Sequence, residues 1–120
     1  MPVRRHLDSV SLTPIILQVL LSLGEGERHG YAIAADIADR TSGRIRVQPG
    51  NLYRSLRTML EEGLIDLSTR RPAPDLDDER RRYYRITPKG RRAACGEIER
   101  MEDLLRVAKT ARWLNAKGGA

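Results

Sequence analysis

The segment QPGNLYRSLRTMLEEGLI, from Gln48 to Ile65, constrains the fold of this chain more than any other. Pro49 suits the first turn of a helix and Gly63 suits its end, so the segment predicts a helix over Pro49–Glu62. At 100° per residue, four apolar side chains fall on one side of this helix, and polar side chains with two arginines fall on the other. The helix must therefore bury one face and leave a polar, basic face open.

The two faces of this helix differ in what they can contact. The core face consists of Leu52, Leu56, Met59 and Leu60, with Tyr53 at its edge. Short polar side chains allow a helix to enter the major groove of DNA, which is about 12 Å wide, and arginine can pair with guanine edges there. The candidates for base reading on the opposite face are Asn51, Arg54, Arg57 and Thr58. A solvated helix face has the same composition, so this face alone leaves both interpretations open.

A β-hairpin is expected after this helix. Alternating apolar and polar residues predict a strand over Leu64–Arg71, and Arg80–Ile86 is expected to return as its partner. The proline-containing stretch Pro72–Glu79 cannot lie inside a sheet and must be a loop. The two arms of the hairpin carry five cations that suit contact with DNA phosphates or with the minor groove. These cations are Arg70, Arg71, Arg80, Arg81 and Arg82. The acidic loop tip either points away from a duplex or pairs with these arginines.

Two further helices are expected before this unit, over Thr13–Leu23 and Gly30–Thr41. The first is apolar nearly all round, which is typical of a helix that is buried on more than one side. The inner stripe of the second is expected to consist of Tyr31, Ile33, Ala34, Ile37 and Ala38. His29 is expected to be a satisfied turn residue at its start.

A long amphipathic helix is expected at the end of the chain. Thr87 suits its N-cap and Pro88 its first turn, and the pattern runs to Asn115, or about 40 Å at 1.5 Å per residue. Such a helix overhangs a domain of this size, and a second copy of the chain is the simplest partner for its stripe. The expected dimer contacts are Ile98, Met101, Leu104, Leu105, Ala108, Ala111 and Leu114. The alternative is a helix folded back over its own domain.

Near the end of this helix stands Trp113, the sole tryptophan. It either packs in the dimer interface or forms an aromatic wall for a flat hydrophobic effector between the two subunits.

The elements divide the chain into an N-terminal arm (1–11), a helix–hairpin unit (12–87), a dimerisation helix (88–115) and a disordered tail (116–120). The expected fold class is mostly α with a small β-hairpin (α+β), as a winged helix-turn-helix with a long C-terminal helix.

Composition and charge narrow the range of functions that this chain can have. The net charge of +6 lies within residues 44–92, which hold thirteen basic and seven acidic residues. Charge concentrated in this way indicates a polyanion partner. The two histidines and the single Cys95 have no spacing typical of a catalytic or metal site, so no enzyme, metal or cofactor is expected. No apolar run of 18 residues predicts a membrane span, and a cytoplasmic protein is expected.

Four segments together resemble the PadR family of bacterial transcriptional regulators. They are LTPIILQVLLSL, HGYAIAADI, QPGNLYRSLRTMLEEGLI and RRRYYRITPKGRR, and they cover roughly residues 12–92. The resemblance implies a homodimer that binds a palindromic DNA operator, usually as a repressor, with the helix at Pro49 as its recognition helix and the hairpin as its wing. It also implies that Tyr31 and Tyr53 brace or touch the DNA backbone and that Arg54 and Arg57 face the groove.

The resemblance has two further implications. The last helix resembles the dimerisation helix of short-form members, in which effectors can bind at the dimer centre, and this gives Trp113 weight as an effector contact. The acidic loop tip departs from the usual basic, glycine-containing wing, and the chain is short after Trp113. A winged-helix adaptor that binds other proteins is the alternative, in which the acidic tip and the long helix are the working surfaces.

Overall fold

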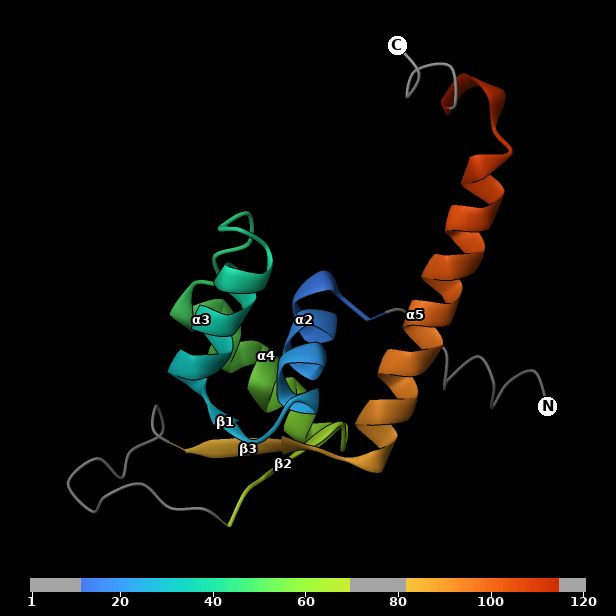
Figure 1. Cartoon of the computed structure of the whole chain (residues 1–120). Coiled ribbons are helices and arrows are strands. Elements are labelled where there is room, and N and C mark those ends of the chain that lie inside the picture. Colours follow the sequence, from blue (N-terminus) through green and yellow to red (C-terminus); the bar gives the residue numbers. More distant parts are fainter. Residues whose placement is uncertain (1–11, 70–81, 115–120) are drawn as a thin grey trace.

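The computed structural model describes residues 12–69 and 82–114, and Figure 1 shows how their elements are arranged. The chain forms helices α2 (Pro14–Gly24), α3 (Gly30–Arg40), α4 (Pro49–Glu61) and α5 (Pro88–Lys109). Strands β1 (Arg28–His29), β2 (Ile65–Leu67) and β3 (Tyr83–Ile86) form one antiparallel sheet at the base of the helices. This architecture confirms a mostly helical winged-helix fold with a long last helix.

The helix starts follow from local capping chemistry, as the sequence predicts. The Thr13 hydroxyl accepts a hydrogen bond from the Ile16 N–H at 3.1 Å, and Pro14 occupies the first turn of α2. The Thr87 hydroxyl does the same for the Gly90 N–H at 3.0 Å at the start of α5. Each cap satisfies a backbone N–H that has no partner inside the helix.

The sheet has three strands, whereas the sequence predicted only a hairpin. β3 lies in the middle and pairs with both β1 and β2, so that Ile65 faces Ile86 and His29 faces Tyr83. β1 was missed because two residues are too few to show an alternating pattern, and its pairing depends on a strand more than fifty residues later. The outer parts of the predicted arms, within residues 70–81, lie outside the described residues.

A single core lies between α2, α3, α4 and the sheet. Its completely buried side chains come from all three helices and from β2, and they include Val19, Ile33, Ile37, Met59 and Ile65. The predicted core face of α4 is confirmed, since Leu52 and Leu56 are buried with Met59. Tyr31 was wrongly placed in the inner stripe of the second helix: its side chain is 58% exposed, because at 100° per residue it lies on the opposite side of α3 from the buried Ile33.

α5 ends earlier than the sequence pattern predicts. The helix stops at Lys109, and residues 112–114 form a separate helical turn, so a continuous helix to Asn115 was wrong. At the stop, the Thr110 hydroxyl donates to the Val107 carbonyl at 2.7 Å, and the Ala111 N–H bonds the Ala108 carbonyl three residues back. A threonine that takes a backbone carbonyl competes with the helical pattern, and three-residue bonds tighten the last turn.

Candidate nucleic-acid interface

The face of α4 that points away from the core is polar and basic. Asn51, Arg54 and Arg57 are exposed on it, and Thr58 is half-buried at its margin. The Arg54 guanidinium group donates a hydrogen bond to the Asn51 side-chain oxygen at 2.7 Å. Because Asn51 is neutral, this contact orients the arginine and leaves its charge uncompensated. The four candidates for base reading therefore share one helix face.

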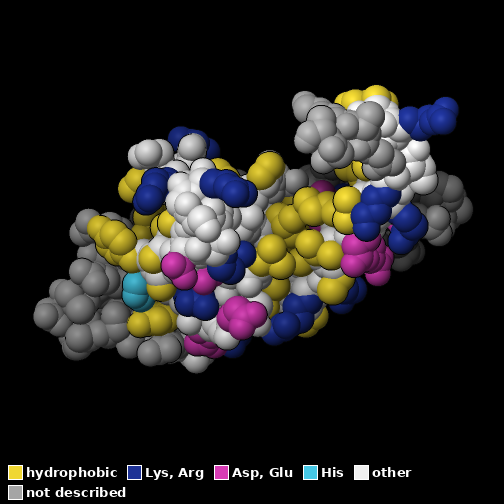
Figure 2. All heavy atoms as spheres, turned by 45° about the horizontal axis from the view of Figure 1, so that its top comes forward, with side chains coloured by type: hydrophobic (Ala, Val, Ile, Leu, Met, Phe, Trp, Pro, Cys, Tyr) yellow, Lys and Arg dark blue, Asp and Glu magenta, His cyan; other side chains and the backbone are white. Residues whose placement is uncertain are grey.

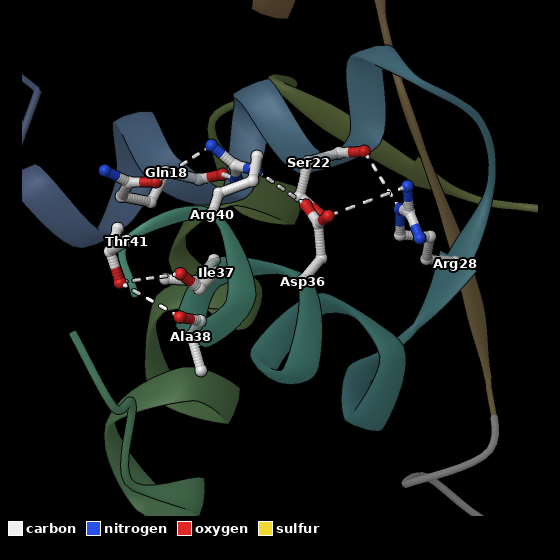
Figure 3. Close-up of polar contacts among 8 residues, drawn as sticks. All are labelled: Gln18, Ser22, Arg28, Asp36, Ile37, Ala38, Arg40 and Thr41. Atoms are coloured by element: carbon white, nitrogen blue, oxygen red, sulfur yellow. Dashed lines mark hydrogen bonds and ion pairs between the residues drawn. The ribbon is translucent and has the colours of Figure 1, made fainter. Parts of the chain in front are cut away.

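A polar network fixes α3 against α2, and α4, which carries this face, packs against both helices (Figure 3). Arg40 of α3 donates to the side-chain and main-chain oxygens of Gln18 in α2, both at 3.1 Å, and to the Asp36 carboxylate at 2.9 Å. Arg28 donates to the Ser22 carbonyl at 3.1 Å and lies 4.0 Å from the other Asp36 oxygen. Desolvation raises the pKa of Asp36, but the hydrogen bond from Arg40 and the charges of Arg40 and Arg28 bring the pKa below its ordinary value.

The start of α3 brings together three of the aromatic residues that the sequence singled out. His29 caps the helix through its Nδ1, which accepts the Ala32 N–H at 3.2 Å, and its ring meets Tyr83 edge-on at 5.3 Å between centroids. His29 thus caps the start of the helix as expected, but it belongs to strand β1 and not to a turn. Tyr53 of α4 reaches the same point, since a Cβ built on Gly30 would lie 2.5 Å from its hydroxyl. Tyr53 is therefore held against α3, and Tyr31 is exposed in the first turn of the same helix.

In the wing, the described residues show only part of the predicted basic surface. Arg82 precedes β3 and is exposed. Arg70, Arg71, Arg80 and Arg81 lie outside the described residues, as does the acidic tip. The exposed Arg85 on β3 was missed as a candidate, although its alternation with the buried Tyr84 could have identified it as an outward-facing cation.

The outer half of α5 exposes apolar side chains. Figure 2 shows such side chains gathered between α5 and the helical domain, which consists of α2, α3, α4 and the sheet. Met101 is 46% exposed, Leu104 68% and Leu105 56%. Ile98 and the buried Ala94 pack instead against the domain's own core, so the first half of α5 is folded back onto the domain. Ala108 is half-buried within the helix, and Ala111 and the half-buried Leu114 lie beyond its end. Their roles in a dimer stay predictions.

The remaining candidates are placed as follows. Trp113 lies in the short helical turn after α5 and is 71% exposed, so its role as an effector contact stays a prediction. Cys95 is a free, exposed thiol on α5. Within residues 12–69 and 82–114, no cluster of three potential metal ligands occurs. None of the helices in these two ranges is long and apolar enough to cross a membrane.

Comparison with known proteins places the chain in a family. The model of the transcriptional regulator PadR-like family matches residues 19–95. A transcriptional regulator of Mycobacterium tuberculosis is 32% identical over 90 residues, which cover 75% of this chain and 78% of that protein. The family match therefore includes the second half of α2, all of α3 and α4, the three strands and the start of α5.

Solved structures show the same fold. A transcriptional regulator from Clostridium thermocellum superimposes with a TM-score of 0.67 at 24% identity, covering 92% of this chain and 93% of the other. A PadR family transcription regulator from Clostridium difficile gives a TM-score of 0.66 at 21% identity, covering 81% and 96% of the two chains. The family match and the sequence identity to the mycobacterial regulator lead to one conclusion: this chain is a member of the PadR-like family of transcriptional regulators.

Proposed function

We propose that this protein is a homodimeric repressor that binds a palindromic DNA operator, with α4 in the major groove and the wing on the backbone or in the minor groove. The observation that carries the proposal is the exposed face of α4, where Asn51 orients Arg54 and leaves its charge free. The core face of the same helix is buried, so the polar face is held on a rigid element. Bidentate contacts between arginine and guanine require such a fixed presentation.

The dimer part of the proposal rests on α5. A contiguous apolar surface around Leu104 and Leu105 is open in the single chain, and such surfaces mark contacts with partners. A twofold dimer would present two copies of α4, and recognition helices in such dimers bind half-sites about 34–36 Å apart. A palindromic operator matches that symmetry.

A binding titration tests the proposal. The purified protein is titrated onto the duplex just upstream of its own reading frame, with fluorescence anisotropy as the signal, random duplex as competitor and a salt series. We expect binding that survives competitor with one dimer per site. Binding lost equally to random duplex would contradict sequence-specific regulation, and no binding at low salt together with a co-purifying protein would favour the adaptor alternative.

Replacing Arg54 identifies the reading residue. Arg54→Ala is expected to weaken operator binding by about 1–3 kcal/mol and to relax the preference at one base pair. Arg82→Ala is the matched control, because the removal of a phosphate-binding side chain is expected to weaken all duplexes alike. Equal weakening of operator and random duplex by Arg54→Ala would remove Arg54 from the base-reading set.

Repression itself needs a measurement in cells. A reporter placed behind the operator is expected to rise in expression when the protein is deleted or carries Arg54→Ala. A fall in expression would show activation instead, because the sign depends on where the operator lies relative to the promoter.

A further inference from the structure

A second group of cations lies on the segment that connects α3 to α4, over residues 41–48. Ile45 and Val47 are half-buried and pack against the core, whereas Arg44 and Arg46 are exposed. Alternation of this kind is typical of an extended segment, in which successive side chains point to opposite sides. Two arginines therefore face the same side of a connection that contains no acidic residue.

This connection is anchored to the end of α3. The Thr41 hydroxyl donates to the Ile37 carbonyl at 2.8 Å and accepts the Ile45 N–H at 3.1 Å. Gly43 has a φ of +79°, and a Cβ built there would lie 2.9 Å from Nη2 of Arg46. The Arg46 guanidinium group thus covers a turn in which glycine leaves room for it. Both cations are carried by ordered backbone, which lowers the entropy cost of binding.

The position of the connection relative to α4 is opposite to that of the wing. α3 starts at the sheet and has 11 residues, so its last turn lies about 16 Å from the sheet. α4 then runs back towards the sheet and ends just before β2 (Figure 1). The arginine connection therefore precedes the first turn of α4, and the wing strands follow its last turn.

Within the described residues, no carboxylate compensates the charges of Arg44 and Arg46. Arg28 and Arg40 lie beside Asp36, Arg100 pairs with Glu97, and Arg106 pairs with Asp103. Neither arginine of the connection forms an ion pair with any carboxylate in the described part of the chain. Arginines whose charge is balanced by a carboxylate within the fold attract a polyanion more weakly than these two do.

We propose that Arg44 and Arg46 bind phosphates of the DNA backbone at the end of α4 opposite to the wing. This inference rests on the proposed DNA-binding function and adds a second backbone-binding site to it. Phosphate contacts fix the orientation of a protein on the duplex and carry no sequence information directly. Binding at both ends would hold α4 in the groove from two sides, which would set its angle to the base pairs.

The test compares two double variants with the wild-type protein in salt titrations on operator and random duplexes. R44Q/R46Q removes the two proposed phosphate-binding cations. R106Q/R112Q removes the same charge from exposed positions near the end of α5 and in the short helical turn that follows it, with dimerisation checked by light scattering. For R44Q/R46Q we expect the slope of log K against log salt to fall by about 0.9 for each phosphate that is no longer neutralised, and affinity for both duplexes to fall alike. The control is expected to keep the wild-type slope.

An unchanged slope for R44Q/R46Q, or a decrease in affinity confined to the operator, would overturn the phosphate assignment. If the wild-type protein bound neither duplex, the proposed function itself would fail, which is a different result. Circular dichroism checks that each variant is folded. Phosphate ethylation interference provides the independent measurement: we expect two groups of sensitive phosphates per half-site, one absent in R44Q/R46Q and the other in R82Q. Retention of both groups in R44Q/R46Q would also overturn the inference.

Discussion

The helical domain and the outer half of α5 use the same kinds of apolar side chain in opposite ways. In the domain, Leu56 is 1% exposed and Ile33 is completely buried. In the outer half of α5, Leu104 is 68% exposed and Val107 is 66% exposed. Three helices and a sheet enclose the first group within one chain, while no other element of the described residues encloses the second group on the helix that leaves the domain (Figure 1).

The difference indicates which interactions a single chain can complete. Burial of apolar surface stabilises a fold only when other elements cover that surface, and exposed contiguous surfaces of this kind mark sites for partners. The domain should thus keep its fold without a partner, and the outer half of α5 should depend on a second copy. Five variants, the first of them a double substitution, test these two regions and the contacts that hold the domain together.

The largest effect is expected from L104N/L105N, which alters the exposed stripe of α5. A dimer loses four buried leucines, each worth about 1.5–3 kcal/mol, so the dissociation constant should rise at least about a thousandfold. Analytical ultracentrifugation measures this change, and circular dichroism should still show a folded domain. Glu99→Asn is the control, because at 100° per residue the exposed Glu99 lies on the other side of α5 from Leu104 and Leu105. Wild-type dimerisation by L104N/L105N would refute the α5 interface.

Leu56→Ala should have the next largest effect, in the completed core. A buried leucine truncated to alanine leaves a cavity and lowers the free energy of unfolding by about 2–5 kcal/mol. Urea denaturation of this variant is compared with that of Leu67→Ala, whose native side chain is 42% exposed and whose truncation should cost less than about 1 kcal/mol. Equal decreases in stability at the two positions would mean that the α4 core face is less important than its burial indicates.

Gly90→Ala tests the junction at which α5 meets the domain. A Cβ at Gly90 would lie 2.2 Å from the Leu64 carbonyl oxygen, so the backbone must shift and we expect the protein to be destabilised by about 1–3 kcal/mol. Gly96→Ala, in the same helix, meets nothing within 4 Å and should stabilise the protein by up to about 1 kcal/mol. Thermal melts of the two variants should therefore move in opposite directions, and a shared direction would contradict the close approach at Gly90.

Asp36→Asn tests the network between α2 and α3. Because the folded pKa of Asp36 lies below its ordinary value of 3.8, the ionised carboxylate stabilises the fold above that pH, and this contribution is lost as the pH falls through the lower folded value. Since its arginine partners are about one-third exposed, we expect the variant to be less stable by only about 1 kcal/mol at neutral pH. Urea denaturation across pH should show wild type and variant converging below about pH 4, and a constant difference would contradict the role of the charge.

Ser42→Gly should have the smallest effect, and it should stabilise the protein. Ser42 has a φ of 54°, a left-handed conformation in which glycine avoids the steric cost of a Cβ, so the gain should be about 0.5–1 kcal/mol. Ser55→Gly, inside α4, should instead destabilise by a similar amount. Thermal denaturation of both variants gives the signs. A lower stability of Ser42→Gly would show that the Ser42 side chain contributes more than its backbone strain costs.

Much of the fold was predictable from local patterns. The caps at Thr13 and Thr87 and the core face around Leu56 depend on residues within a few positions of each other, and these predictions were confirmed. Family membership was likewise carried by short motifs that lie along the chain. The roles of the α4, wing and α5 residues in binding DNA or a second copy stay predictions.

The predictions that failed have both distant and local causes. β1 exists because β3 pairs with it, whereas Tyr31 is exposed because it lies on the opposite side of α3 from the buried Ile33. The stop of α5 at Lys109 follows from a threonine hydroxyl that bonds a backbone carbonyl in a region where no tertiary contact within the described residues extends the helix. The spacing of apolar residues does not reveal this competition between a side-chain hydroxyl and the backbone hydrogen bonds of a helix.

By itself, the sequence determined where helices begin, which side of α4 must be buried, and that positive charge concentrates in the middle of the chain, because these depend on spacing and composition. Only the tertiary structure decided which arginines are already paired. Arg28 and Arg40 both form ion pairs with Asp36. Arg44 and Arg46 instead face solvent, at the end of α4 that lies opposite to the wing. Charge is counted along the chain, but compensation of charge depends on distances that only folding sets.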